Sequence, residues 1–382
     1  MKKNIFILAT SAVLLVSCGK GKTNEFTSAS GLQASRFETT LDDGKTTTHL
    51  YAIKNANGME VCVTNIGARI VSIWTPDQSG NFRDVVLGFD NIQPYIPVKT
   101  LFGAIVGRYA NRIADGKMTL SNRATYRLKA NDGENILHGG VRGFHARYFN
   151  IEQQDSATLI CRYLSKNGEE GFPGDMRVTV TYSLSGDNAL RIDYEAEANQ
   201  STVVNLTNYS YFNLSGDPNN TILDHSLFVD ADSYTPTNSE LIPTGVIAKV
   251  NGTPMDFTTP KIVGERIDDT TFEALKFGQG YDHNYVLNHS GDVNRLAAKL
   301  VSPTTGIALE VYTTEPGLLV YTGNSLDGTD VGKNGIAYRS RTAVCLATQH
   351  FPNSPNIPSF PTTELFPGNV YHTQTIYKFM VE

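Results

Sequence analysis

Short runs in which apolar and polar residues alternate follow one another from residue 37 to the end of the chain. A period of two places successive side chains on opposite faces, which is typical of half-buried β-strands. No long segment has the period of a helix, so the pattern predicts an all-β chain. The strands that we expect most clearly cover residues 60–64, 69–74, 308–314, 318–323, 342–349 and 373–381.

The clearest hairpin joins residues 177–184 to residues 189–197 through the turn 185–188. Gly186 and Asn188 in this turn suit the positive φ angles that tight hairpin turns require. Strands this numerous are expected to form two large sheets packed face to face, as in a two-sheet β-sandwich. No linker rich in Pro, Gly or Ser divides residues 37–382, so we expect a single domain there.

The first 17 residues have the layout of a secretory signal. Lys2 and Lys3 precede an apolar run over residues 5–16, which is too short for a membrane span and is soon followed by Cys18. Residues 15–18 resemble a bacterial lipoprotein signal, in which the Cys becomes the lipidated first residue, and a plain signal peptide is the alternative. We expect a signal peptide at 1–17 and a flexible tether at 18–36. A lipid on Cys18 would then hold the protein in the bacterial cell envelope, periplasmic or associated with the outer membrane.

Charge and cysteine content narrow the possible partners. Removing Lys2 and Lys3 takes the formal net charge from −6 to −8, and no basic run remains, so nucleic acid is not expected as a partner. Cys62, Cys161 and Cys345 lie far apart in apolar or alternating segments. They are expected to be buried thiols rather than metal ligands, although one disulfide among them stays open in an oxidising compartment.

One uncharged stretch, residues 205–214, differs from an ordinary half-buried strand. It reads Asn-Leu-Thr-Asn-Tyr-Ser-Tyr-Phe-Asn-Leu, and its alternation sorts neither face into purely apolar or purely polar positions. Aromatic rings stack on the apolar face of a pyranose, while amides and hydroxyls hydrogen-bond to its hydroxyl groups. The stretch is therefore compatible with two interpretations, a sugar site and a buried structural strand.

Three further segments carry candidate binding groups. Asn111 and Arg112 stand side by side beyond an apolar run, and a guanidinium can fork onto two adjacent sugar hydroxyls, although a surface salt bridge is the ordinary alternative. His138 precedes two glycines, which would let the backbone approach a ligand closely. Asp282 lies between aromatic and amide residues, where a hydrogen bond within a turn is the alternative.

Taken together and in this order, these segments resemble the aldose 1-epimerase family, also called galactose mutarotases. The resemblance implies a β-sandwich of the galactose mutarotase type with a sugar cleft, no metal and no cofactor. Its ligand would be a free aldose such as glucose or galactose, or the end of a sugar chain. The landmarks that carry the resemblance are residues 107–113, 137–144, 169–174, 205–214, 241–245, 281–285, 310–317 and 321–324.

The reaction of that family interconverts the α and β anomers of a free aldose by opening and reclosing its ring. A carboxylate base removes the proton of the anomeric hydroxyl while an imidazolium acid protonates the ring oxygen. The resemblance implies that Arg112, His138 and Asp282 hold the sugar hydroxyls, with Asn111 beside them.

At the two proton-transfer positions this chain departs from the family pattern. Tyr209 stands where the family has its acid His, and Ala347 stands where the family has its base Glu. A methyl group cannot accept a proton, and a phenol of ordinary pKa about 10 is poorly matched to proton transfer near neutrality. The sugar cleft is therefore expected to persist without its usual catalytic pair.

Three functions stay open. In the first, the protein is an aldose 1-epimerase in which Tyr209 fills one proton-transfer role and Glu315 or His138 fills the other, with Glu315 also near the sugar. In the second, it is a tethered carbohydrate-binding protein that has lost turnover. In the third, it is a glycoside hydrolase or lyase, for which Asp282 and Glu315 are the only plausible pair of carboxylates.

Overall fold

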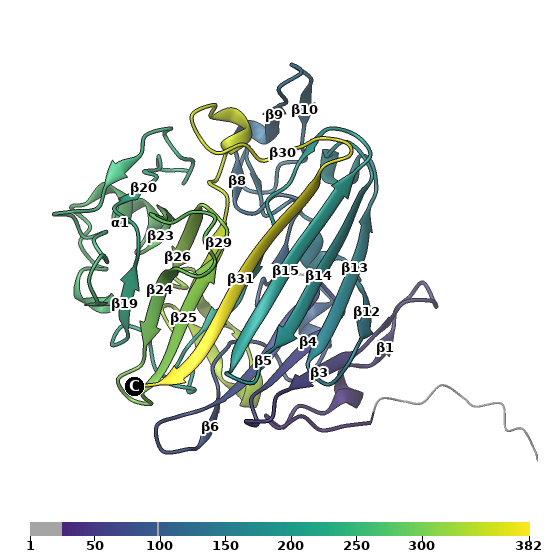
Figure 1. The fold of residues 1–382 in the computed structure, drawn as a ribbon, viewed down its shortest axis with the longest axis vertical. Coiled ribbons are helices and arrows are strands. Elements are labelled where there is room, and N and C mark those ends of the chain that lie inside the picture. Colours follow the sequence, from purple (N-terminus) through teal and green to yellow (C-terminus); the bar gives the residue numbers. More distant parts are fainter. Residues whose placement is uncertain (1–24, 98) are drawn as a thin grey trace, which may run out of the picture.

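The computed structural model of the protein describes residues 25–97 and 99–382. These residues form almost only strands and loops, with a single short α-helix, α1 (Glu273–Gly278), so the predicted all-β class is confirmed. Figure 1 shows long strands running side by side on one half of the molecule and shorter strands gathered on the other. No described helix is long and apolar enough to cross a membrane.

A nine-stranded antiparallel sheet forms one layer of the sandwich (Figure 1). It contains the predicted hairpin, and the inward side chains of the two hairpin strands alternate with exposed or half-buried ones as the sequence pattern requires. In spatial order its strands are β12 (Asn150–Gln153), β13 (Thr158–Ser165), β14 (Met176–Leu184), β15 (Ala189–Ala198), β31 (Val370–Val381), β25 (Ile307–Thr313), β24 (Leu296–Val301), β19 (Ser226–Val229) and β22 (Lys261–Ile262).

Two smaller sheets and a strand pair face this layer. The large apolar cluster of the protein draws its side chains from the nine-stranded sheet and from these smaller sheets, so the core lies between them. The six-stranded sheet has the order β18 (Tyr211–Phe212), β29 (Val344–Gln349), β26 (Gly317–Tyr321), β23 (Asp282–Val286), β20 (Ser233–Tyr234) and β21 (Ala248–Lys249). The four-stranded sheet and the pair are β3 (Leu50–Lys54), β4 (Glu60–Thr64), β5 (Arg69–Pro76) and β6 (Phe82–Asp84), and β7 (Ala104–Val106) with β17 (Thr207–Tyr209).

The remaining elements are short and lie in the connections. The small strands pair in twos as β1 (Thr39–Thr40) with β2 (Thr47–Thr48), β8 (Arg112–Ile113) with β11 (Ile136–Leu137), β9 (Lys117–Thr119) with β10 (Thr125–Arg127), β16 (Thr202–Val203) with β30 (Glu364–Leu365), and β27 (Asp327–Val331) with β28 (Ala337–Arg339). Turns of 3-10 helix are η1 (Ala34–Phe37), η2 (Gln93–Tyr95), η3 (Ala114–Gly116), η4 (Phe144–Ala146), η5 (Glu169–Gly171), η6 (Val263–Glu265), η7 (Lys333–Gly335) and η8 (Ser354–Asn356).

The N-terminal segment corrects the expected extent of the tether. Residues 25–36 are packed on the body: Leu32 and Ala34 are buried, and Ser72 on β5 donates its hydroxyl hydrogen bond to Ser30 at 2.9 Å. Although the segment has few large apolar residues, backbone hydrogen bonds such as that from Ala34 N–H to Phe26 O hold it in place. A tether reaching residue 36 is therefore wrong, while Cys18 and the signal lie outside the described residues.

The three cysteines of the described chain behave as expected. Cys62, Cys161 and Cys345 are buried free thiols, and burial raises the pKa of each. Thiols in this state act as small apolar side chains within the core.

Candidate active site

One cavity of about 310 Å³ collects the candidate sugar-binding residues that are far apart in sequence. Asn111, Arg112, His138, Tyr209 and Asp282 all line it. Its walls also include Tyr211, Leu241, Phe277 and Tyr321. Polar groups converging between aromatic and apolar walls are the usual construction of a small-molecule site.

The short pairing of β8 with β11 brings two of these residues together. Arg112 opposes Leu137 in register, so His138 follows directly beside Asn111. The Asn111 N–H donates to Nδ1 of His138 at 3.1 Å, and the His138 N–H donates to the Asn111 carbonyl at 3.0 Å. Both residues have positive φ, which is uncommon for residues other than glycine.

These hydrogen bonds decide what His138 can do. Because Nδ1 accepts a backbone N–H, we assign the proton of the neutral ring to Nε2. Burial lowers the pKa of His138 well below its usual range, and the nearby Arg112 acts in the same direction. His138 is therefore a neutral hydrogen-bond donor at neutral pH, rather than an imidazolium acid.

Arg112 both lines the cavity and takes part in a salt bridge. Its Nε donates to Oδ2 of Asp132 at 2.7 Å, and only 12% of its side chain is exposed. The two terminal nitrogens have no other hydrogen bond within the described residues and remain for a ligand. Asp132 could not be identified from the sequence, because its pairing with Arg112 depends on the conformation of the loop between β10 and β11.

Asp282 is the only carboxylate among the described residues that line the cavity. It begins strand β23 and pairs with Tyr321 on β26, so the alternative of an Asp in a turn is excluded. Burial raises the pKa of Asp282 to about 6, against a smaller opposing effect of Arg112. A carboxylate with this pKa is a suitable general base near neutral pH.

Tyr209 ends strand β17 and forms an aromatic wall of the cavity. Its ring lies edge-on to His138 with centroids 5.0 Å apart, and roughly parallel to Tyr321 at 6.4 Å. Burial raises the pKa of the Tyr209 phenol well above its ordinary value of 10, so the hydroxyl stays protonated. Tyr321 was not singled out as a site residue, although it lies in one of the segments that carry the family resemblance.

The rest of the stretch 205–214 is structural. All ten residues are buried, and the asparagine amides donate to backbone carbonyls: Asn205 to Ala110, Asn208 to Gly103, and Asn213 to Thr342. Of these ten residues only Tyr209 and Tyr211 line the cavity. Amides that satisfy buried backbone groups explain the mixed polarity that the sequence pattern attributed to sugar binding.

The two glycines after His138 also serve packing. A Cβ atom on Gly139 would lie 2.0 Å from the carbonyl oxygen of Gly107, and Gly139 has a φ of +80°. Only glycine meets both conditions. The sequence predicted that a ligand would approach the backbone closely here. In the structure the backbone of Gly107 makes this close approach to Gly139.

Ala347 lies outside the cavity lining. It is on β29 opposite Leu319 of β26, is fully buried, and belongs to an apolar cluster that also contains Tyr209. No ionisable side chain therefore occupies this position of the sheet.

Glu315 does not agree with the role expected of it. It is not among the residues that line the cavity, and its side chain is 1% exposed. Oε2 lies 2.5 Å from Nδ1 of His350, and Tyr371 donates its hydroxyl hydrogen bond to Oε1 at 3.0 Å. Glu315 is therefore wrong both as a substitute base and as a sugar ligand, and it does not form a carboxylate pair with Asp282 across this cavity.

The comparison with known families agrees with this geometry. A family model described as aldose 1-epimerase matches residues 49–378.

The chain belongs to the aldose 1-epimerase family.

Relatives of this family cover most of the chain. Galactose mutarotase of Homo sapiens is 41% identical over 323 residues, which is 85% of this chain and 92% of that protein. Aldose 1-epimerase of Escherichia coli (strain K12) is 35% identical over 336 residues, 87% of this chain and 95% of that protein.

Solved structures of the family share the fold. An aldose epimerase homologue from C. elegans has a TM-score of 0.81 at 28% identity and covers 87% of this chain and 99% of its own. Galactose 1-epimerase from Lactobacillus acidophilus NCFM has a TM-score of 0.78 at 26% identity and covers 90% and 97%. The predicted galactose mutarotase type of β-sandwich is thereby confirmed, and membership of the family supports the interconversion of sugar anomers in general.

Proposed function

We propose that this protein binds a free aldose, such as glucose or galactose, in the cavity around Arg112, and that it interconverts the α and β anomers slowly. The proposal is carried by one observation: Arg112, His138 and Asp282 converge on one cavity, while no ionisable group occupies position 347. Arg112, His138 and Asp282 bind the sugar, whereas Ala347 cannot act as a base, so mutarotation is slow.

The binding groups suit a pyranose. The terminal nitrogens of Arg112 and the Nε2–H of His138 donate to ring hydroxyls, and Asp282 accepts from them. Tyr209 and Tyr321 offer flat apolar surfaces to the C–H face of the ring.

In this proposal Asp282 and Tyr209 carry out the two proton transfers. Asp282 accepts the proton of the anomeric hydroxyl as the C1–O1 double bond forms and the bond from C1 to the ring oxygen breaks. The ring oxygen takes a proton from the Tyr209 hydroxyl. After rotation about the C1–C2 bond the steps run in reverse. Because the pKa of Tyr209 is well above 10, this donation is costly and the reaction is slow.

A second candidate is sugar binding without turnover. It is favoured by the burial of Ala347 in the apolar cluster that contains Tyr209, which leaves no base at that position. In this case Asp282 would serve only as a hydrogen-bond acceptor.

The experiment measures binding and rate separately. Isothermal titration with galactose and glucose reports binding, and polarimetry of freshly dissolved α-galactose and α-glucose reports mutarotation above the spontaneous rate. We expect binding together with a small acceleration that Asp282→Asn abolishes, whereas Glu315→Gln, the same chemical change outside the cavity, leaves the acceleration intact. Binding without acceleration would support the second candidate, and no binding would refute both.

The cellular location belongs to the same proposal. Cys18 closes the apolar run of the signal, so we infer that the mature chain begins at a lipidated Cys18 and is anchored in the cell envelope. The cavity would then act on sugars outside the cytoplasm.

A further inference from the structure

A second cavity shares no lining residue with the sugar cavity. It has a volume of about 350 Å³, within the range of ligand pockets. Five parts of the chain line it: the N-terminal segment with Arg36, strands β5 and β6 with Trp74, Phe82 and Arg83, the following loop with Asp90, the loop after β18 with Gly216, and η7 with Lys333.

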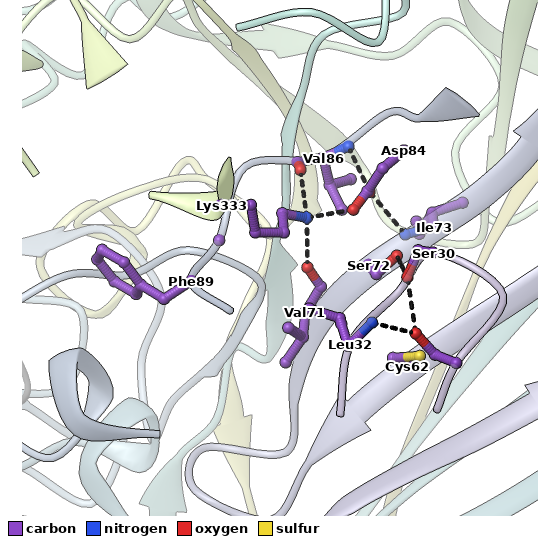
Figure 2. A network of polar contacts seen from close by, with 12 residues as sticks. Ser30, Leu32, Cys62, Val71, Ser72, Ile73, Asp84, Val86, Phe89 and Lys333 are labelled. Carbon is purple, nitrogen blue, oxygen red and sulfur yellow. Dashed lines mark hydrogen bonds and ion pairs between the residues drawn. The ribbon is translucent and has the colours of Figure 1, made fainter. Parts of the chain in front are cut away.

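One wall of this cavity is closed by a lysine whose hydrogen bonds are all used. Figure 2 shows Lys333 Nζ between the carboxylate of Asp84 at 2.5 Å and the carbonyls of Val71 and Val86 at 2.8 and 2.9 Å. An ammonium has three donors, so none is left for a ligand. The pair of Lys333 and Asp84 therefore makes a rigid, electrically balanced wall and does not attract an anion.

An aromatic surface forms another part of the lining. Trp74 on β5 and Phe82 on β6 are stacked, with ring centroids 6.1 Å apart and planes at 20°. Both rings are only half-buried although they line the cavity, so apolar surface stays open to solvent. A flat, partly exposed tryptophan is suited to the C–H face of a pyranose.

Charged side chains with unused hydrogen-bonding groups surround this surface. Arg36 uses one terminal nitrogen on Asp90 at 3.3 Å, and Arg83 uses Nε on Asp77 at 3.0 Å, which leaves further donors on both. The stem of Arg83 packs closely on Gly216, since a Cβ atom added at Gly216 would lie 2.7 Å from the Cβ of Arg83. The cavity thus offers both hydrogen-bond donors, from the guanidinium groups, and an acceptor, from the carboxylate of Asp90. Sugar hydroxyls can both donate and accept, so they fit this mixture better than an anion does.

We propose that this cavity is a second carbohydrate site that binds a neutral pyranose, with one ring stacked on Trp74 and its hydroxyls bonded to Arg83, Arg36 and Asp90. The site does not depend on the proposed epimerase activity, since it has no residue in common with the first cavity.

Trp74 provides a selective readout, because it is the only tryptophan of the 382 residues. The full chain is titrated with the methyl glycosides of glucose, galactose and mannose, which cannot open their rings and so cannot be epimerised. We expect a saturable change in tryptophan fluorescence with at least one of them. Arg83→Gln and Asp90→Asn should weaken this binding about tenfold, the usual effect of losing a hydrogen bond to a charged group.

Control variants separate this site from the first cavity. Arg112→Met should leave the fluorescence titration unchanged, whereas Arg83→Gln should leave galactose mutarotation unchanged. For Trp74→Leu, which removes the signal, isothermal titration should show the loss of this binding while circular dichroism shows a folded protein.

Three results would overturn the proposal. The first is no saturable fluorescence change with any of the glycosides, and the second is a change that Arg83→Gln and Asp90→Asn do not weaken. The third is a preference for glucuronate or for vesicles of phosphatidylglycerol and phosphatidylethanolamine over the neutral glycosides, which would make the cavity an anion or membrane site.

Discussion

The ring of Tyr209 lies edge-on to the imidazole of His138, with ring centroids 5.0 Å apart and planes at 63°. This contact places a phenol that keeps its proton next to an imidazole that stays neutral, since burial shifts the pKa of each away from neutrality. Neither group gives up or takes a proton readily near pH 7. Asp282, with a pKa of about 6, is the titratable group of the cavity suited to that pH range.

Restoring the usual pair of the family should restore a large rate. We expect Tyr209→His combined with Ala347→Glu to accelerate mutarotation by about a hundred- to ten-thousand-fold, the range typical of positioned acids and bases. Each single change should help little, because acid and base act in the same ring opening and their effects are strongly non-additive. Polarimetry of the four proteins measures this, and two single variants whose gains multiply to the full gain would contradict it.

Activity should increase with pH as Asp282 ionises. The base must be deprotonated, and the pKa of Asp282 is about 6, so kcat/KM for mutarotation should rise between pH 5 and 7. The spontaneous rate at each pH is subtracted, and Asp282→Asn serves as the matched variant. A profile that is flat through pH 6, or one that Asp282→Asn retains, would remove Asp282 from the role of base.

The same substitution should stabilise the fold. The folded-state pKa of Asp282, about 6, exceeds the ordinary carboxyl pKa of 3.8, so the stability that protonated Asp282 contributes is fully present below pH 3.8 and is lost as the pH rises through 6. At pH 8 Asp282→Asn removes a charge from the half-buried wall of the cavity and should raise the free energy of unfolding by on the order of 1 to 3 kcal/mol. Denaturant unfolding should show this gain at pH 8 and none at pH 3.5.

Glu315 should matter for stability and not for turnover. Its charge raises the pKa of His350, so their interaction is fully present below the unfolded-state pKa of the imidazole and is lost as pH rises through the folded value. Glu315→Gln should therefore cost about 1 to 3 kcal/mol at pH 6 and less at pH 9. Mutarotation should not change, and a large loss of rate in a folded variant would return Glu315 to the catalytic candidates.

Membrane attachment should depend on one sulfur atom. In bacterial cells that process lipoproteins, Cys18→Ala should move the protein from the membrane fraction to the soluble fraction, because a single acyl-bearing terminus is the only anchor that the sequence indicates. Cys62→Ala, a buried thiol in the folded domain, is the control and should stay with the membrane. Equal membrane binding of the Cys18 variant would exclude the lipid anchor.

The β-strand architecture could be predicted from the pattern of apolar and polar residues. The strand predicted over residues 60–64 is β4 at its observed bounds, although all five of its residues are buried. The hairpin 177–184 with 189–197 became β14 and β15 to within one residue at each end, and its side chains alternate between buried and more exposed positions. A strand that buries one face must alternate apolar and polar residues, so this alternation can be recognised in the sequence wherever one face of a sheet packs on the core. Arg112, His138 and Asp282 were also found from sequence, since these residue types stand in segments that match a family.

The roles of the polar side chains, in contrast, became clear only from the folded structure. Asn205, Asn208 and Asn213 looked like sugar ligands but satisfy buried carbonyls, and Glu315 looked like a spare base but is bonded to His350 and Tyr371. A polar side chain has the same appearance in a sequence whether it faces a ligand or the backbone, because its partner lies across strands distant in the chain. The pKa of a side chain cannot be predicted from the sequence for the same reason. Burial raises the pKa of Asp282 to about 6, and this burial exists only once the sheets have packed.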